Sequence, residues 1–294
     1  MPKRTIPDFQ PVPLFNTPPN LEQLAEAVNR SRNVQSLQSN SVTVKVGNQN
    51  SINTNVTWSR PKRFRLTASV FGGLGGVDIG SNDEVFWMAI RDGGQPSMFF
   101  ARHSEFEHQT DRPVLPVSPE WLIQAMGVCE LDLARIDQQR PPTTRPDGMV
   151  EINTLEPTPI GNYYRTLVVD QKYGFCRELL LYDPSLRLVA QAKQFKHEYY
   201  ASVQTSLPHQ VKARLLPSGS EPLELDIAIA SYVVNGLSPD NVRQFDMPSV
   251  QGFKTVDLGR MGAPAVAPQQ VAPPQPMYPQ VSYRGVQSEG AMMR

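Results

Sequence analysis

Residues 63–70 constrain the fold more than any other segment, because their pattern fits a strand with one buried face. Apolar and polar side chains alternate strictly along it, with the apolar set at Phe64, Leu66, Ala68 and Val70 and the polar set at Arg63, Arg65, Thr67 and Ser69. An alternation with a period of two residues is typical of a half-buried β-strand. Pro61 separates this segment from an earlier strand-like run that ends at Trp58. We therefore expect an antiparallel pair of strands, with Arg63 and Arg65 mostly in solvent.

The rest of the chain contains many segments of the same kind. Strand-like runs occupy residues 41–46, 52–58, 84–91, 98–101, 149–155, 163–171, 175–183, 186–195, 211–215 and 223–234. Short turn sequences join neighbouring runs, as expected of β-hairpins. The run at 84–91 is apolar at both parities, so we expect it to be covered on both faces. The glycine-rich segment 71–77 lacks the ending of a phosphate loop, and no helix follows it, so it is interpreted as a wide hairpin turn.

Two segments carry helix start signals. Asn20 is a favoured N-cap residue, and Gln23 stands three positions later, in register for a capping box. Ser118 precedes Pro119 in the arrangement of an N-cap and a first helical proline, and Gly127 supplies a stop signal. The first helix is amphipathic and the second is strongly apolar, so both should lie on apolar surface.

These elements predict a mainly β fold of the α+β class. We expect a single curled antiparallel sheet that forms an incomplete β-barrel of about ten or eleven strands, with helices covering the concave face. This half-barrel domain should comprise residues 20–258. The proline-rich residues 1–19 predict an extended arm, and the Pro/Ala/Gln-rich residues 259–294 predict a disordered tail that cannot bury enough apolar surface to order itself.

Charge and hydropathy argue against several classes of function. The chain has 28 basic and 28 acidic residues, and a net charge of zero gives no electrostatic indication of a nucleic-acid partner. No apolar run is long enough to span a bilayer as a helix. The basic first residues are not followed by the apolar segment of a signal peptide, so we expect either a cytoplasmic protein or one whose export signal has been removed.

Catalytic and metal-binding patterns are weak, so we expect a non-enzymatic protein with no cofactor and no bound metal. His103 and His108 lie with two glutamates in one six-residue segment, which offers residue types that metals use, but no third ligand is identifiable and a solvated loop is the alternative. The sequence has no Gly-x-Ser-x-Gly nucleophile elbow. Cys129 and Cys176 both have apolar neighbours, so either a disulfide or two buried thiols would fit.

The candidate binding residues are one arginine and a surplus of apolar side chains on few elements. That surplus consists of Trp58, Phe64, Leu66, Phe86, Trp87, Met88, Ile90, Trp121 and Leu122. A curled sheet under one layer of helices can leave an apolar cavity suited to acyl chains, or the helices can fill the space completely. Arg60 ends a strand, and its fork of donors would either hold carbonyl groups of a covering helix or point to solvent.

The order of these segments resembles the lipoprotein-carrier family of LolA and LolB. The resemblance covers residues 20–250 and rests on the end of the first helix at 33–37, the segment Trp-Ser-Arg-Pro-Lys-Arg-Phe-Arg-Leu at 58–66, the turn and tryptophan of 81–87, and the helix at 119–127. It implies an incomplete barrel with a helical lid over a hydrophobic cavity, and it implies that Arg60 bonds to that lid. The greater length, the proline-rich ends and the missing lipobox cysteine depart from the family pattern.

The leading hypothesis is a non-enzymatic protein of the bacterial cell envelope, in the periplasm or at the outer-membrane face, that binds and carries lipid or lipoprotein acyl chains. Its expected partners are those acyl chains or lipoproteins, with the membrane surface and other envelope proteins as further candidates, and we expect a monomer. The alternative is a structural or interaction module of the envelope with a filled core and no ligand.

Overall fold

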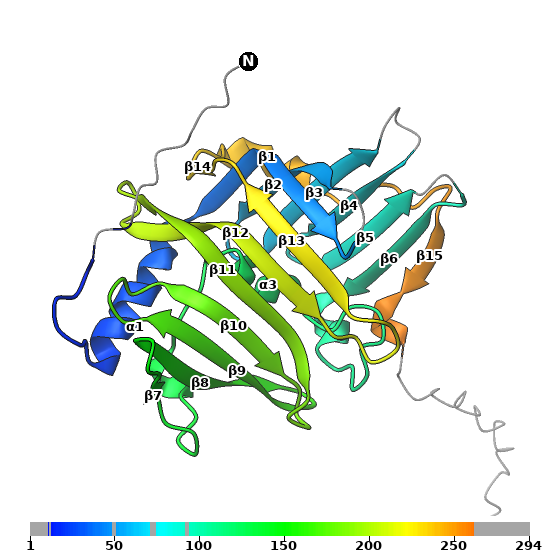
Figure 1. Cartoon of the computed structure of the whole chain (residues 1–294). Coiled ribbons are helices and arrows are strands. Elements are labelled where there is room, and N and C mark those ends of the chain that lie inside the picture. Colours follow the sequence, from blue (N-terminus) through cyan, green and yellow to red (C-terminus); the bar gives the residue numbers. More distant parts are fainter. Residues whose placement is uncertain (1–10, 12, 49–50, 71–74, 92–93, 262–294) are drawn as a thin grey trace, which may run out of the picture. The chain divides into compact units, whose positions relative to one another are not determined.

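A large open sheet dominates the structure (Figure 1). The computed structural model describes residues 11, 13–48, 51–70, 75–91 and 94–261, which belong to one compact unit. The strands are β1 (Ser36–Val46), β2 (Ile52–Ser59), β3 (Arg63–Val70), β4 (Gly75–Ser81), β5 (Val85–Arg91), β6 (Ser97–Arg102), β7 (Thr143–Thr144), β8 (Met149–Thr158), β9 (Gly161–Asp170), β10 (Cys176–Tyr182), β11 (Leu188–Tyr200), β12 (Thr205–Leu215), β13 (Leu223–Ile229), β14 (Val233–Val234) and β15 (Lys254–Asp257). The helices are α1 (Leu21–Asn29), α2 (His103–Phe106) and α3 (Pro119–Ala125), with 3-10 turns η1 (Arg30–Asn33), η3 (Leu133–Arg135), η4 (Pro239–Phe245) and η5 (Leu258–Arg260).

The strands form two meanders that meet where β1 pairs with β13. Strands β1 to β6 pair in chain order on one side, and β13 back to β7 pair in reverse chain order on the other. Strand β15 adds to β6 in the parallel direction, and β7 and β15 lie at the two ends of the described sheet, which therefore does not close. The predicted mainly β fold, a curled and incomplete barrel, is confirmed. The described sheet has fifteen strands rather than ten or eleven, because β7, β14 and β15 are too short to show a pattern in the sequence and β4 lies where the sequence predicts a turn.

Strand β4 occupies part of the segment for which the sequence predicts a hairpin turn. Residues 71–74 lie outside the described residues, but β4 already begins at Gly75. Gly80 pairs with Trp87 of β5, and a Cβ atom on Gly80 would come within 2.1 Å of the Trp87 Cζ2 atom. The glycine therefore leaves the space that the indole ring occupies. A strand that uses glycine in this way lacks the alternation by which strands are recognised.

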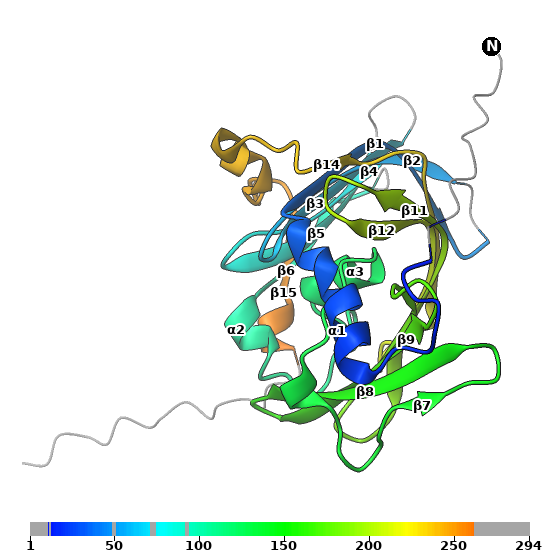
Figure 2. The ribbon, with the colours of Figure 1, turned by 90° about the vertical axis from the view of Figure 1, so that its left-hand side faces the viewer.

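Helices α1 and α3 lie inside the curve of the sheet, as expected (Figure 2). Helix α1 begins with the predicted capping box, in which Gln23 N donates to Asn20 Oδ1 at 2.8 Å and Asn20 N donates to Gln23 Oε1 at 2.9 Å. The chain leaves α3 through Gly127, whose φ of 97° favours glycine. From α3, Trp121 packs into a core cluster with β8–β12 and Ile123 into a second cluster with β1–β3, so this short helix divides the interior in two.

Part of the proline-rich arm packs on the domain. Residues 1–10 and 12, like residues 262–294 of the tail, lie outside the described residues. Leu14 and Phe15 donate their backbone N–H groups to Lys172 O at 3.0 and 3.2 Å, and the Phe15 side chain packs against the cluster around Trp121.

The outer face of β3–β6 is covered by a later part of the chain. Residues 239–257, here called the strap, run from η4 to β15 along this face (Figure 2). Trp87 is fully buried there in a cluster to which Met247 and Phe253 of the strap contribute. The other face of β5 is covered as well, since Phe86 packs against Phe106 and the segment around η5. The sequence correctly indicates that this strand is covered on both faces.

Arg65 lies under the strap rather than in solvent. It forms an ion pair with Asp78 at 2.7 Å and donates to Gln244 O of the strap at 2.8 Å. The prediction that Arg65 is mostly solvated is therefore wrong, because a segment almost 180 residues later in the chain covers its face of the sheet. Arg63 lies nearer to solvent and pairs with the exposed Asp83.

Candidate functional site

The predicted cavity residues fall into separate groups. Five of them lie in α3 or in the core clusters that pack against it. Trp58, Phe64 and Leu66 belong to the cluster that packs against one side of α3. Trp121 is buried in the cluster on the other side, and Leu122 packs against the same cluster. Side chains of the helix and the sheet thus meet closely on the concave face.

The four candidate residues on β5 lie apart from α3. Phe86 packs at the edge of the interior against Phe106, with which it forms an edge-to-face aromatic pair. Met88 and Ile90 are half-buried and share the Phe86 face of the strand. Trp87 lies on the opposite, strap-covered face, because neighbouring residues of a strand point to opposite sides. The structure therefore does not bring Trp87 to the concave side with the others.

Arg60 joins the sheet to the segment that follows α1. Its Nε atom donates to Val34 O at 2.8 Å, and a terminal nitrogen donates to Ser31 O at 3.0 Å. The other terminal nitrogen pairs with Glu130, which follows α3, at 2.6 Å. The guanidinium group also lies 5.5 Å from the centre of the Trp58 ring. One half-buried side chain thus connects the turn between β2 and β3 to the segments that follow both covering helices. The Arg60–Pro61 peptide bond in that turn is cis.

Glu130 is held in its charged form by this arrangement. Burial alone would raise the pKa of Glu130, but the hydrogen bonds from Arg60 and Arg32 outweigh burial and hold that pKa below its usual range. Arg32 approaches Glu130 from the exposed side at 3.0 Å. The Glu130 carboxylate therefore pairs with two arginines, Arg60 from the turn between β2 and β3 and Arg32 from the turn after α1.

The segment 126–131, here called the α3 loop, collects further polar contacts. Asn29, the last residue of α1, exchanges two hydrogen bonds of 2.9 Å with the backbone of Leu131. The Ser31 hydroxyl donates to Cys129 O. These contacts satisfy backbone groups of the α3 loop through side chains at the end of α1 and in the turn that follows it. The end of α1 is therefore attached to the α3 loop.

Arg165 anchors α3 from the opposite side of the interior. Its side chain is only 7% exposed, donates to Thr154 Oγ1 and to Gln124 Oε1 of α3 at 3.2 and 2.9 Å, and pairs with Glu156 at 3.1 Å. Arg165 is not among the site residues that the sequence predicts. Its place in the strand could have indicated burial. Arg165 lies two residues after Tyr163 in β9, so both side chains point to the interior face of the sheet.

Two clefts lie along α3 on the concave side. The Arg60 cleft has a volume of about 380 Å³, and residues lining it include Trp58, Arg60, Ile123, Val128 and Glu130. The Arg112 cleft has a volume of about 360 Å³, and residues lining it include Phe106, Arg112, Trp121, Tyr163 and Leu181. They share Glu120, Gln124, Glu156 and Arg165, so they are neighbours. More than half of the residues that line each cleft are polar or charged, so both clefts are amphipathic rather than apolar.

No protein-family model matches this sequence, and no curated protein matches it. A solved structure, described as an outer membrane lipoprotein-sorting protein domain from Vibrio parahaemolyticus, matches over 76% of this chain and 98% of that one, with a TM-score of 0.50 and 9% identity. The fold is LolA-like. A LolA superfamily protein from Nitrosomonas europaea matches over 76% and 97% of the two chains (TM-score 0.47, 13% identity). A DUF1329 family protein from Desulfovibrio piger matches over 76% and 95% (TM-score 0.46, 14% identity).

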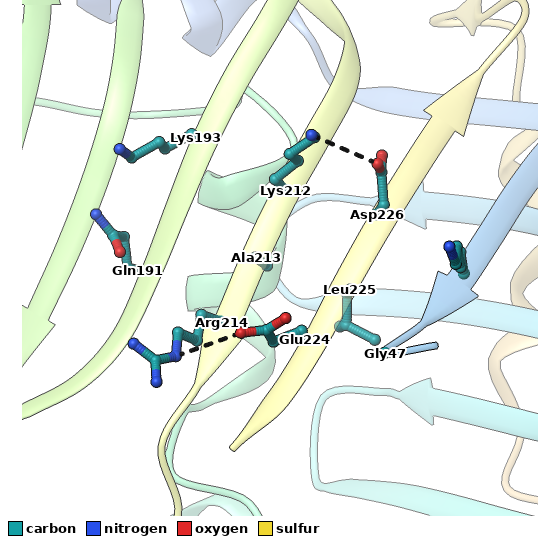
Figure 3. A pocket seen from close by; sticks show the side chains of 10 residues that line it. Gly47, Gln191, Lys193, Lys212, Ala213, Arg214, Glu224, Leu225 and Asp226 are labelled. Atoms are coloured by element: carbon teal, nitrogen blue, oxygen red, sulfur yellow. Dashed lines mark ion pairs between the residues drawn. The ribbon is translucent and has the colours of Figure 1, made fainter. Parts of the chain in front are cut away.

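A third hollow lies on the outer face of the LolA-like sheet, over β1 and β11–β13 (Figure 3). It is a shallow depression of about 310 Å³ with a largely charged lining. Lys212 pairs with Asp226 at 3.8 Å and Arg214 with Glu224 at 3.7 Å across neighbouring strands, and these side chains are exposed. Exposed cross-strand ion pairs are ordinary on the solvated face of a sheet. We therefore interpret the depression as solvent-facing surface.

The two cysteines of the LolA-like domain lie beside each other in the interior. Both are buried free thiols, Cys129 in the α3 loop and Cys176 in β10. A hydrogen bond between the thiols lowers the pKa of Cys129 and, with burial, raises the pKa of Cys176. Of the two interpretations open from the sequence, the structure has the buried thiols.

His103 and His108 do not lie on a solvated strand end. Residues 103–106 form the single turn α2, in which His103 is buried and its Nε2 atom lies 2.9 Å from Asn82 O. His108 is exposed, and its Nδ1 atom lies 2.7 Å from Ser104 O. Within the described ranges, no group of three or more His, Cys, Asp or Glu side chains is placed to hold a metal ion. Among those same residues, no helix has both the length and the apolar character needed to cross a membrane.

Proposed function

We propose that this LolA-like chain is a non-enzymatic carrier of lipid or lipoprotein acyl chains in the bacterial cell envelope. The acyl chain would lie between the concave face of the sheet and helices α1 and α3, with Arg60 as the latch. The observation that carries the proposal is the Arg60 fork, whose three hydrogen bonds attach the segments that follow α1 and α3 to the turn between β2 and β3. The proposal includes a monomer, in the periplasm or at the outer-membrane face, with lipids or lipoproteins as partners.

Loading requires the helices to separate from the sheet, because Trp58 and Ile123 fill the interior. Breaking the three hydrogen bonds of Arg60 costs roughly 5–9 kcal/mol, at about 1.5–3 kcal/mol for a hydrogen bond to a charged group. Burying an acyl chain contributes about 0.8 kcal/mol per CH₂, so a dozen methylenes supply roughly 10 kcal/mol. The two values are similar, which is the condition for a lid that must both load and release.

Lipid binding is tested directly on the purified chain. Native mass spectrometry and solvent extraction should find co-purified lipid, and a fluorescent fatty acid should bind the delipidated protein saturably at one site. The absence of both co-purified lipid and saturable probe binding would contradict the carrier function.

The latch is tested by Arg60→Gln, with Arg63→Gln as the matched control. Arg63 lies in the next strand and pairs with Asp83 at the surface, away from the helices. Because Arg60→Gln removes the charged bonds to the lid, we expect the fluorescent fatty acid to associate at least several-fold faster, whereas Arg63→Gln should not change the rate. Stopped-flow fluorescence measures both; equal rates in the two variants would show that Arg60 does not limit opening.

A second candidate is a structural or interaction module of the envelope. The packing of both core clusters favours it, since side chains such as Leu37, Leu167 and Leu179 are 0–1% exposed. Under this alternative the helices never leave the sheet. Hydrogen exchange of α1 and α3 would then be the same with and without fatty acid, whereas the carrier function predicts changed exchange in these helices.

A further inference from the structure

Arg112 has an environment unlike that of the other interior arginines. It lies between α2 and α3, and the carbon of its guanidinium group is 4.1 Å from the centre of the Phe106 ring and 5.0 Å from that of Tyr163. It donates to Phe106 O at 3.1 Å and, at a long 3.5 Å, to Pro116 O. Its Nε atom is buried and has no hydrogen-bond partner.

No carboxylate pairs with Arg112 in the part of the chain that the structure describes. Arg60 and Arg165, which approach the same helix, pair with Glu130 and Glu156 at 2.6 and 3.1 Å. Burial, the largest cause, lowers the pKa of Arg112, while Tyr163 and the carboxylate of Glu107 raise it to a smaller extent. A half-buried guanidinium group of this kind is stabilised by an anion that enters its cleft.

The Arg112 cleft also contains a second donor without an acceptor. Trp121 Nε1 is buried and unpartnered, and Trp121 lines the cleft with Arg112. Among the described residues six buried side-chain nitrogen or oxygen atoms lack a partner, and three of them belong to Trp58, Arg112 and Trp121, which line the two neighbouring clefts. Arg112 Nε and Trp121 Nε1 belong to residues that line the same cleft, and a ligand that supplies acceptor oxygens there would give such donors partners.

The remaining walls show what kind of molecule carries those oxygens. Tyr163, Leu181 and Phe106 offer apolar surface, which a small solvated anion cannot use. The carboxylates of Glu107, Glu120 and Glu156 also line the cleft; Glu156 is paired with Arg135 and Arg165, and Glu107 is exposed. These carboxylates oppose a free inorganic anion, whereas an amphiphile gains apolar contacts that offset the repulsion.

We propose that the Arg112 cleft binds the anionic head group of an acyl lipid, whose carboxylate or phosphate oxygens accept hydrogen bonds from Arg112 and Trp121. The acyl chain then extends along α3 toward the Arg60 cleft, which shares Gln124 with it. This inference rests on the proposed carrier function and assigns its ligand class, an anionic rather than a neutral amphiphile.

The experiment compares two ligands of equal chain length, dodecanoate and dodecanol, by displacement of a fluorescent fatty acid at neutral pH. The wild-type protein should bind dodecanoate at least about tenfold more tightly, because charge-assisted hydrogen bonds are the strong ones. Arg112→Gln should reduce dodecanoate binding to the dodecanol level and leave dodecanol binding unchanged, which also shows that the variant is folded. Arg91→Gln is the matched control, since Arg91 stacks on Phe253 outside the cleft.

The possible outcomes separate this inference from the carrier function. If dodecanol and dodecanoate bind equally well, or if Arg112→Gln weakens both equally, the head-group site is wrong and the carrier function stands. If neither ligand binds the wild-type protein, both proposals are wrong. The last measurement uses inorganic phosphate as the competitor. We expect phosphate in large molar excess not to displace the fluorescent fatty acid. If phosphate displaces it from the wild-type protein but not from Arg112→Gln, the cleft is a free-anion site instead of a lipid site.

Discussion

Three arginines lie between the sheet and the segments that cover its concave face, and the sequence singles out one of them, Arg60. Arg60 could be singled out because it stands at a strand end beside a tryptophan and a proline, and its donors do reach the segment after α1. Arg165 occupies an inward parity but looks like an ordinary strand residue. Arg112 lies in an irregular segment, and its aromatic partner Tyr163 is 51 positions away. Contacts between segments so far apart leave no local pattern in the sequence.

His197 gives the folded chain a sensitivity to acid that can be measured. It stacks 3.9 Å from the Phe175 ring, and burial, followed by the charge of Arg177, lowers the pKa of His197 from 6.5 to about 3. Between these values the unfolded chain binds a proton that the folded chain does not. The resulting stability is fully present above pH 6.5 and is lost as the pH falls toward 3, by roughly 4–5 kcal/mol at most.

We therefore expect His197→Phe to flatten the dependence of the free energy of unfolding on pH in this window. The variant keeps the ring stacking and loses the contact of Nε2 with Cys176 O, so it should lose about 1 kcal/mol of stability at neutral pH. Urea denaturation at a series of pH values measures both effects. His108→Phe, at an exposed position, should retain the wild-type slope; an unchanged slope in His197→Phe would show that other groups cause the acid sensitivity.

At the scale of elements, prediction succeeded where a strand or helix carries its own signal. The capping box of α1 and the alternation of β3 depend on side chains within a few residues, and both are found as expected. Strand β4 shows the opposite case, because Gly80 is explained only by the ring of Trp87 in the neighbouring strand. The short strands β7 and β15 likewise form only because longer strands provide a partner.

Gly80→Ala should destabilise the fold by roughly 2–4 kcal/mol, because its Cβ atom would overlap the benzo ring of Trp87. The same substitution should cost clearly less in a Trp87→Phe background, where the smaller ring leaves room. Urea denaturation of the single and double variants gives the interaction free energy. Strictly additive effects would show that the glycine serves another purpose.

At the scale of the whole molecule, the strap is the feature that sequence reasoning did not reach. Alternation of apolar and polar residues predicts a sheet with one buried face, and it therefore predicts that the polar side of β3 faces solvent. The strap instead covers that side, with Arg65 donating to Gln244 O and with Phe253 packed in the cluster around Trp87. The helices and the strap thus lie on opposite faces of the N-terminal meander (Figure 2).

This separation predicts that the strap stabilises the domain without affecting the lid. Phe253→Ala should lower the free energy of unfolding by roughly 1–3 kcal/mol, since Phe253 is half-buried against the Trp87 cluster. It should leave the affinity for the fluorescent fatty acid unchanged. Val250→Ala, at an exposed position of the same strap, is the control and should alter neither quantity. A loss of fatty-acid affinity in Phe253→Ala would instead reveal coupling between the two faces.

The two edge strands of the sheet bear on whether two copies of this protein can pair edge to edge. An unclosed barrel presents unpaired backbone groups along its two edge strands. A long exposed edge strand is a template on which another chain can aggregate. Here the described sheet ends in the two-residue β7 and the four-residue β15, which runs from Lys254 to Asp257. The β15 edge is short and polar and gives a neighbouring chain little to pair with. At the other end β7 pairs with only Val150 and Glu151 of the ten-residue β8, so β8 is the longer edge on which another strand could add.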